Sequence, residues 1–377
     1  FYRTVSIMNG LIEAFSNLED PRVDRHKIHK LIDIIVLTIC AVISGAEGWE
    51  AIETFGKTKK DWLQKFIALE NGVPSHDCIS RVMSRLEPSK MSECFVEWVK
   101  GVSDLTDGDI VSIDGKTARG SYNNKDKMGA IHMVSAWANQ AGVSLGQVKT
   151  DAKSNEITAI PKLLDLLEIK GCIVTIDAMG CQTDIAEKII DKSADYVLAV
   201  KDNQPQLHEA IIDYFDVAIK SNDFELAKIQ FEEIVDAGHG RIEVRRHYLS
   251  TCLATLPKST RWKGIKSIAM VESVRTNNGK TSIARRHYIN SITDVKVFGH
   301  AVRSHWGVEN SLHWVLDVIF REDDSRIRMG YGAESFNVIR QISLNLLKKE
   351  VSKLSIKRKR FMAGLDDLFR EKVLFSL

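Results

Sequence analysis

Two stretches of the chain share one pattern, in which a short apolar run ends in an aspartate followed by small residues. Residues 109–120 read D-I-V-S-I-D-G-K-T-A-R-G, and residues 172–182 read C-I-V-T-I-D-A-M-G-C-Q. Apolar β-branched runs favour buried strands, so Asp114 and Asp177 are expected at two strand ends. A carboxylate there is costly to desolvate unless a cation, a metal or solvent compensates. Asp114 alone fits an Asp-Gly turn, and the recurrence at Asp177 favours a site.

A third carboxylate, Glu309, lies in the expected helix 300–320, between Trp306 and Trp314. If the two strands are parallel neighbours, their ends lie roughly 4.8 Å apart. Carboxylates at that spacing repel each other unless they share a proton or a divalent cation. Two strand-end aspartates and a helix glutamate form an oxygen-rich set suited to Mg²⁺ or Mn²⁺. Two-metal phosphoryl transfer on nucleic acids uses such a set.

The order of the expected elements indicates an α/β fold class. From residue 109 the pattern predicts strands at 109–114, 130–139, 143–150, 172–177 and 195–201. Helices are expected at 155–168, 183–193 and 205–220. A β-rich insertion at about 225–292 follows, with strands at 242–249, 265–275 and 282–290. Within it, Asn277-Asn278-Gly279 is expected to turn a hairpin.

The chain ahead of this core is expected to be an N-terminal helical domain, residues 1–107, with helices at 33–44, 49–66 and 73–86. Arg81 and Arg85 share a face of the third helix, as they would in a short helix-turn-helix on DNA. Two arginines on one face are common, so a helical scaffold on the catalytic core is the favoured interpretation. The catalytic domain is expected at 108–350, followed by a basic C-terminal tail at 351–377.

Basic residues are clustered, although the net charge of the whole chain is only +2. Residues 241–290 hold eleven Lys or Arg against two acids, and residues 340–377 hold ten against four. Clustered basic charge is the electrostatic signature of a surface that binds phosphate backbones. For either cluster alone, a solvated face is the more common explanation.

The cysteines and the apolar runs restrict the kind of protein. None of the six cysteines forms a C-x-x-C pair, so the sequence carries no zinc signal. Scattered cysteines and the lack of a signal-peptide pattern suit the reducing cytoplasm. The most apolar run, residues 31–46, contains Asp33 and is too short to span about 30 Å of hydrocarbon, so no membrane association is expected. A small-molecule enzyme is disfavoured, because neither a phosphate-binding glycine loop nor a G-x-S-x-G turn is found.

Five long blocks, spread over nearly the whole chain, are specific enough to compare with known families. They read L-T-I-C-A-V-I-S-G-A-E-G-W-E, S-I-D-G-K-T-A-R, T-D-A-K-S-N-E-I-T-A-I-P, T-I-D-A-M-G-C-Q and H-W-G-V-E-N-S-L-H-W-V-L-D-V. Together they resemble the H-repeat-associated transposases of Rhs elements, which belong to the DDE insertion-sequence transposases. The resemblance implies an RNase H-like catalytic core, a mixed sheet flanked by helices. In that fold the first and fourth strands are neighbours, and a β-insertion precedes the helix with the glutamate.

The family's catalytic triad of Asp, Asp and Glu falls on Asp114, Asp177 and Glu309, which would also be the metal ligands. Related insertion-sequence transposases often add Tyr, Arg and Lys at spacings that fall here on Val302, His305 and Leu316, so those three are missing. Candidates to replace them are Arg303, Arg321, Arg326 and Arg328. Rival third carboxylates are Asp317, Glu322, Asp323 and Asp324.

The helix around Glu309 carries further expectations. His305, Glu309, His313 and Asp317 recur every four residues and are expected along one slowly drifting stripe. The two histidines are expected to meet phosphates or carboxylates, because Mg²⁺ prefers oxygen ligands. Trp306 and Trp314 are expected in the core, with base stacking as the alternative.

The resemblance implies a transposase that binds double-stranded DNA, with a homodimer expected on DNA. Two ions, Mg²⁺ or Mn²⁺, would serve cleavage at the element ends and joining of the freed 3′-hydroxyl to target DNA. Two other functions stay open: an inactive or repurposed DNA-binding protein derived from a transposase, and a metal-dependent nuclease without strand transfer. The candidate DNA contacts are Lys116, Arg119, Arg241, Arg245, Arg246, Arg285, Arg286, Arg303, His305 and Arg321.

Overall fold

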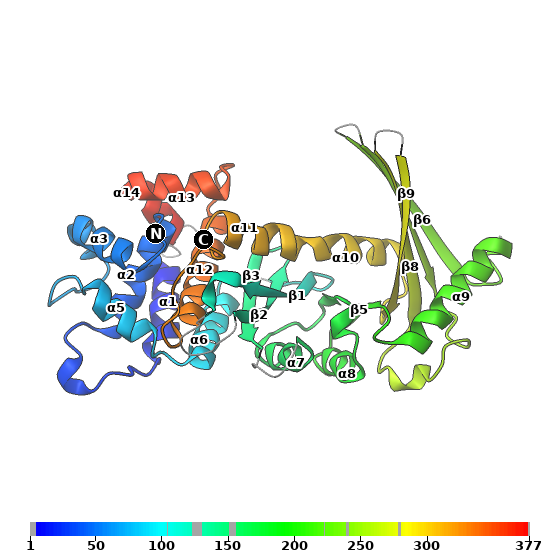
Figure 1. Ribbon diagram of the computed structural model, residues 1–377, viewed down its shortest axis with the longest axis horizontal. Coiled ribbons are helices and arrows are strands. Elements are labelled where there is room, and N and C mark those ends of the chain that lie inside the picture. The colour runs from blue at the N-terminus through cyan, green and yellow to red at the C-terminus, as the bar shows by residue number, and fades with distance from the viewer. Residues whose placement is uncertain are drawn as a thin grey trace. The chain divides into compact units, whose positions relative to one another are not determined.

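The computed structural model describes residues 5–103, 105–122, 130–150, 156–221, 223–238, 241–277 and 280–375, without the side chains of 5–8, 26, 238 and 241. The chain divides into two compact units (Figure 1). Unit 1 comprises Phe1–Asp104, Gly115–Lys153 and Glu309–Leu377. Unit 2 comprises Leu105–Asp114 and Ser154–Val308. Among the described residues, no helix is both long and apolar enough to cross a membrane.

Unit 1 is mainly helical. Its N-terminal part contains α1 (Val5–Ser16), α2 (Leu31–Ile43), α3 (Trp49–Thr58), α4 (Lys60–Leu63), α5 (His76–Met83) and α6 (Pro88–Lys100). Helix α2 is buried on every side, because its sequence L-I-D-I-I-V-L-T-I-C-A-V-I is apolar all round. Its one acid, Asp33, accepts a hydrogen bond from the backbone N–H of Leu69. Burial raises the pKa of this carboxyl.

The second central helix of unit 1 is α12 (Gly332–Lys349), which packs on α2 and on strand β3 (Val143–Lys149). Its buried face carries amides that complete hydrogen bonds of β3. Asn345 accepts from the N–H of Ser144 and donates to its C=O, and Gln341 accepts from the Ser144 hydroxyl at 2.6 Å. These bonds satisfy polar groups that burial would otherwise make costly, so they fix α12 on the sheet.

The sheet has nine strands in the hydrogen-bonded order β3-β2-β1-β4-β5-β9-β8-β7-β6. The first five in the chain are β1 (Ile110–Ala118), β2 (Ile131–Ala138), β3, β4 (Ile173–Ile176) and β5 (Asp195–Val200). Strands β1, β4 and β5 run parallel, and β2 and β3 form an antiparallel pair. The molecule is therefore a mixed α/β protein, and its first and fourth strands are neighbours, as the resemblance implied.

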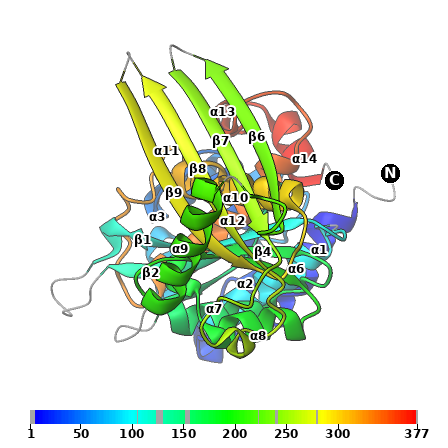
Figure 2. The same cartoon turned by 90° about the vertical axis from the view of Figure 1, so that its right-hand side faces the viewer.

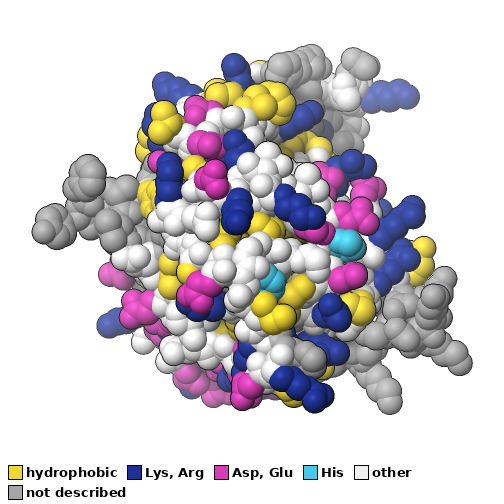
Figure 3. All heavy atoms as spheres, turned by 90° about the vertical axis from the view of Figure 1, so that its left-hand side faces the viewer, with side chains coloured by type: hydrophobic (Ala, Val, Ile, Leu, Met, Phe, Trp, Pro, Cys, Tyr) yellow, Lys and Arg dark blue, Asp and Glu magenta, His cyan; other side chains and the backbone are white. Residues whose placement is uncertain are grey.

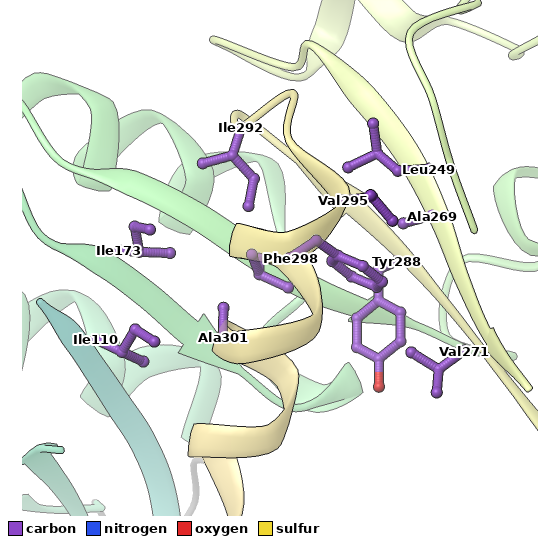
Figure 4. Close-up of a cluster of buried hydrophobic side chains, with 11 residues drawn as sticks. Ile110, Ile173, Leu249, Ala269, Val271, Tyr288, Ile292, Val295, Phe298 and Ala301 are labelled. Atoms are coloured by element: carbon purple, nitrogen blue, oxygen red, sulfur yellow. The ribbon is translucent and has the colours of Figure 1, made fainter. Parts of the chain in front are cut away.

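Helices cover the unit 2 part of the sheet. They are α7 (Glu156–Leu166), α8 (Thr183–Asp191), α9 (Pro205–Ser221) and α10 (Val295–Gly307). Figure 4 shows how α10 holds this part together: Phe298 and Ala301 lie in one buried cluster with Ile110 of β1, Ile173 of β4 and Tyr288 of β9. Helix α10 therefore packs on strands from the first half of the sheet and on a strand of the insertion.

The insertion is a four-stranded antiparallel extension of the same sheet, and Figure 2 shows its strands side by side. Its strands are β6 (Ile229–Gly238), β7 (Arg241–Ser250), β8 (Ser267–Asn277) and β9 (Lys280–Asn290). The three strands expected from the sequence are β7, β8 and β9. Strand β6 was missed, because the three acids Glu232, Glu233 and Asp236 break its alternation. The predicted turn residues Asn278 and Gly279 lie outside the described residues.

The expectation of a basic C-terminal tail was wrong. Residues in this stretch form α13 (Ile356–Leu365) and α14 (Asp367–Phe375), and the cations Lys359, Arg360 and Arg370 are buried. Arg360 donates to the carbonyls of Val42 and Ala46 at the end of α2. Part of the counted charge is therefore inside the fold, and Figure 3 shows Lys, Arg, Asp and Glu interspersed on the face where α3 and α5 lie.

Candidate active site

Each aspartate follows the last residue of β1 or β4 that is paired with the other strand. The expectation that Asp114 ends its strand was wrong, because β1 continues to Ala118, whereas Asp177 does follow the end of β4. The parallel register of β1 and β4 ends with Ile113 opposite Ile176, and the next residues are Asp114 and Asp177. Both side chains are half-buried. Strand ends of a parallel pair meet at one edge of the sheet, so the two carboxylates emerge at the same edge.

Asp177 also shapes the turn that follows it. Its Oδ1 accepts hydrogen bonds from the backbone N–H of Met179 at 3.0 Å and of Gly180 at 3.4 Å, and caps the short helix Ala178–Gly180. A Cβ on Gly180 would lie 2.3 Å from Cγ2 of Ile176. The small residues after this aspartate therefore have a packing reason, and the capping bonds hold the carboxylate in one orientation.

Hydroxyl groups two residues before each aspartate link the strands to α10. Ser112 and Thr175 are register partners, and the Thr175 hydroxyl lies 3.1 Å from that of Ser112 and 2.9 Å from Nδ1 of His305. Burial lowers the pKa of His305, which outweighs the opposite effect of Asp177, so its ring is neutral near pH 7. The sequence analysis did not predict this series of hydrogen bonds, although the matched runs I-V-S-I-D and I-V-T-I-D each carry a hydroxyl residue two positions before the aspartate.

Glu309 lies in a π-helical turn, Val308–His313, that separates α10 from α11 (Trp314–Val318). Its side chain is exposed and forms no ion pair with any residue that the structure describes. Single π-helical turns are rare and occur often at functional sites. Glu309 belongs to unit 1, whereas the two aspartates belong to unit 2.

The π-turn also explains two expectations that were wrong. Trp306 and Trp314 are exposed by 40% and 55%, so they are surface residues and not core. His305 is tied to β4, Glu309 is exposed and His313 is buried, so these side chains do not form one stripe. A stripe drawn at 3.6 residues per turn does not continue through i→i+5 hydrogen bonding, which adds a residue to the turn.

The rival third carboxylates are engaged with cations in unit 1. Lys116 Nζ lies 2.7 Å from Asp317, in hydrogen-bond contact with Glu322, and 3.9 Å from Asp323. Asp324 pairs with Arg321 at 3.1 Å. The side chain of Lys116, which was expected to contact DNA, is only 11% exposed and is surrounded by carboxylates.

Most of the other expected DNA contacts are paired within the protein. Arg245, Arg246 and Arg285 each contact two acids on the insertion or on α9. Arg303 lies 3.7 Å from Asp236, and Arg119 lies 3.8 Å from Asp323 with 84% of its side chain exposed. His305 is held inside by Thr175. The side chain of Arg241 lies outside the described residues.

One exposed cation of the insertion meets an exposed aromatic ring instead. The guanidinium of Arg286 lies 5.3 Å from the ring centre of Trp306. Both residues belong to unit 2, and His305 stands next to Trp306 in the chain. This pair offers a flat apolar face and a positive charge on the surface of that unit.

The donors at the strand ends suit a hard divalent cation by their chemistry. Asp114 and Asp177 offer carboxylate oxygens, and the capping bonds already orient Asp177. Within the described ranges, no group of three or more His, Cys, Asp or Glu side chains is arranged as a metal site. The two side chains of unit 2 whose chemistry suits a divalent cation are therefore Asp114 and Asp177.

Comparison with known proteins gives matches along nearly the full chain. A family model described as "Transposase DDE domain" matches residues 105–346, and its companion "DDE_Tnp_1-associated" matches residues 12–99. "Putative transposase YncI" of Escherichia coli O157:H7 is 46% identical over 98% of this chain and 95% of its own length. "H repeat-associated putative transposase YhhI" of Escherichia coli strain K12 is 44% identical over 97% of this chain and 98% of its own.

Among solved structures, the piggyBac transposase synaptic complex with hairpin DNA is similar to 99% of this chain and covers 79% of its own chain. The TM-score is 0.41 and the sequence identity is 10%, which is too slight a likeness to inform the fold or the site.

Proposed function

Because the chain belongs to the transposase DDE domain family, with H-repeat-associated relatives, we propose that it cleaves DNA at the ends of a mobile element and joins those ends to target DNA. The observation that carries this proposal is that Asp114 and Asp177 each follow the last residue pair of the adjacent parallel strands β1 and β4. Such a pair is suited to metal-assisted phosphoryl transfer. The strand order β3-β2-β1-β4-β5, with β1, β4 and β5 parallel, supports an RNase H-like core.

Asp114, Asp177 and Glu309 are the proposed catalytic residues and metal ligands. Two Mg²⁺ or Mn²⁺ ions, when bound, would activate the attacking oxygen and stabilise the leaving oxygen of an in-line displacement. The protein's own part is to hold the carboxylates in place: Met179 and Gly180 fix Asp177 through their N–H groups. His305, held neutral beside Thr175, packs α10 against the strand that carries Asp177.

Glu309 is the preferred third ligand over its rivals because of charge. Asp317, Glu322 and Asp323 share Lys116, and Asp324 pairs with Arg321, so each already has a cation. A carboxylate that is exposed and lacks an ion pair among the described residues can take a divalent cation without first breaking a salt bridge. This supports Glu309, which the H-W-G-V-E-N block had indicated.

Double-stranded DNA is the proposed substrate, and a homodimer on DNA is the proposed assembly. The exposed cations Arg119, Arg286 and Arg303 are the proposed phosphate contacts, with Trp306 beside Arg286 as an apolar neighbour. We also retain the proposed division into a helical region 1–107 and a catalytic domain 108–350 with its insertion at about 225–292. A partly paired arginine can still bind phosphate, because exposed ion pairs are weak.

The test is Mg²⁺- or Mn²⁺-dependent cleavage and joining of DNA that carries the flanking ends of the native gene. Asp114→Asn, Asp177→Asn and Glu309→Gln should each abolish both reactions and leave DNA binding intact. Asp324→Asn is the matched control, since it removes an exposed, paired carboxylate fifteen positions after Glu309, and it should keep activity. Activity that persists in Glu309→Gln would reject Glu309 as the third ligand. DNA binding without cleavage in the wild type would indicate a repurposed binding protein.

A further inference from the structure

The C-terminal half of β1 makes an unusual set of contacts inside unit 1. Residues 115–118 continue the strand beyond Asp114, and the 3₁₀ turn Arg119–Ser121 follows it. Lys116, Arg119 and Gly120 contact the segment 317–328. That segment begins in α11 and follows directly on the π-turn with Glu309. These contacts join residues about 200 positions apart in the sequence.

Lys116 is the centre of this contact. Its ammonium reaches three carboxylates, of which Glu322 is only 1% exposed and Asp317 is 32% exposed. The Lys116 side chain is only 11% exposed, so little of its charged end faces solvent.

Backbone groups that follow Lys116 also contact the segment 317–328. The N–H of Arg119 donates to Oδ1 of Asp323 at 3.1 Å, and Nε of Arg328 donates to the carbonyl of Gly120 at 2.9 Å. A Cβ on Gly120 would lie 2.4 Å from the carbonyl oxygen of Ser325. The approach is therefore open only to glycine, which gives a packing reason for the final residue of D-G-K-T-A-R-G.

Two further buried cations hold the segment from its other sides. Arg340 of α12 lies 3.8 Å from Glu322 and is itself buried. Arg360 of α13 donates to the carbonyl of Ile319 at 2.6 Å and lies 4.6 Å from the ring centre of Phe320. Three cations therefore hold residues 317–323 in place: Lys116 of β1, Arg340 of α12 and Arg360 of α13.

We propose that Lys116 and Glu322 are positioning residues, whose buried ion pair fixes the segment after the π-turn with Glu309 to residues 115–118 of β1, inside unit 1. Lys116 lies two residues after Asp114 in β1, and Asp317 lies eight residues after Glu309. The catalytic consequence rests on the proposed function, whereas the structural consequence does not. A small displacement of a reacting group can lower a rate about 100-fold, so such a clamp would act on turnover and not on DNA affinity.

The variants are Lys116→Met, Lys116→Arg, Glu322→Gln and the double variant Lys116→Met with Glu322→Gln. The double variant guards against misfolding from a half-removed pair, because it takes away Lys116 and Glu322 together. The buried Arg340 loses its contact with Glu322 in this variant and in Glu322→Gln alike. Lys57→Met is the matched control, since it removes a lysine that is also ion-paired, at 2.5 Å to Glu53, but whose side chain is 67% exposed. Each full-length protein is measured for DNA affinity against salt, for cleavage rate of bound DNA, and for amide hydrogen exchange at 309–318 without DNA.

We expect Lys116→Met and Glu322→Gln each to slow cleavage about 100-fold and to speed exchange at 309–318, with the double variant no worse than either single one. Lys116→Arg should recover most of the rate, and DNA affinity should keep its salt slope throughout. A salt slope lower by about 1 in Lys116→Met would overturn the inference and make Lys116 a phosphate contact. Unchanged exchange at 309–318 would also overturn it. If the wild type does not cleave DNA, the proposed function is rejected. Hydrogen exchange at 309–318 then still tests whether the Lys116–Glu322 pair holds this segment in place.

Discussion

At the scale of single residues, Asp177 shows that a structural and a catalytic role can share one side chain. Its Oδ1 caps the turn 178–180 through the N–H groups of Met179 and Gly180. The turn interpretation of an Asp followed by small residues is thus correct for this residue, and it does not compete with the proposed ligand role. A capped carboxylate is oriented before any cation arrives, which lowers the cost of binding.

The two roles of Asp177 can be separated by substitution. Asp177→Asn keeps an oxygen that can accept the capping bonds, so the free energy of unfolding should stay close to that of the wild type. Asp177→Ala removes the cap and should cost about 1 kcal/mol. Both variants should lose metal-dependent cleavage. Urea unfolding and the cleavage assay measure the two effects, and equal stability of the Ala and Asn variants would show that the cap contributes nothing.

What the sequence could predict at this scale was local. Asp177 was correctly placed after a strand, because the apolar run and the small residues around it lie within a few positions. The same pattern placed the end of the first strand at Asp114, which was wrong, since β1 continues to Ala118. The partners of Lys116 could not be predicted in the same way, because Glu322 lies 206 residues away and exposed cations are the usual expectation for lysine. Trp306 and Trp314 were expected in the core because large aromatic side chains are buried on average, and both are exposed.

At the scale of elements, the pairing of helix α9 with strand β9 introduces a pH dependence. Nε2 of His208 lies 3.1 Å from Nδ1 of His287, which is buried. Burial, with the nearby His208 and Arg285, lowers the pKa of His287 to about 4, and Asp216 opposes this shift. The unfolded chain binds this proton near pH 6.5, so stability is fully present above that pH and falls as the pH drops toward 4.

The expected loss between pH 6.5 and pH 4 is roughly 3 kcal/mol, since each pKa unit corresponds to about 1.4 kcal/mol. It should be absent in His287→Gln, which carries no titrating ring. His300→Gln, at an exposed position in α10, serves as the control and should keep the acid dependence. Urea unfolding at several pH values measures it. The same acid dependence in the wild type and in His287→Gln would refute the assignment to His287.

Most elements matched the sequence pattern, and the mismatches have physical causes. The strands of the first half of the sheet and helices α7 to α9 fall within a few residues of their expected positions, because each has a clear apolar period. Strand β6 was not predicted, because its acids pair with Arg245, Arg246 and His247 on β7. Such cross-strand pairing cannot be inferred from the sequence of one strand.

At the scale of the whole molecule, the C-terminal helices are part of the fold of unit 1 and not an appendage. Arg370 is fully buried, donates to the Ser44 hydroxyl at 2.9 Å, and stacks 4.4 Å from the ring centre of Trp62. Arg360 satisfies the carbonyls of Val42 and Ala46. A count of basic residues predicted a basic tail here, because charge counts carry no information on burial.

A chain that ends at Glu350 should therefore be strongly destabilised. It would lose α13 and α14 and leave at least the carbonyls of Val42 and Ala46 without their donors, at about 1–3 kcal/mol each if they stay buried. Thermal unfolding of the truncated chain, beside the full chain, measures the effect. A melting temperature equal to that of the full chain would restore the view of this region as a tail.

The measurement that tests the central claim most directly is strand transfer from a precut end. DNA that already carries the 3′-hydroxyl end of the element is incubated with supercoiled plasmid, Mg²⁺ or Mn²⁺, and the wild type or Asp114→Asn. Joined products that require the metal and Asp114 are the predicted result, because Asp114 and Asp177 follow the last residue pair of two adjacent parallel strands. Cleavage of intact ends without any joining of precut ends would contradict the account and indicate a nuclease.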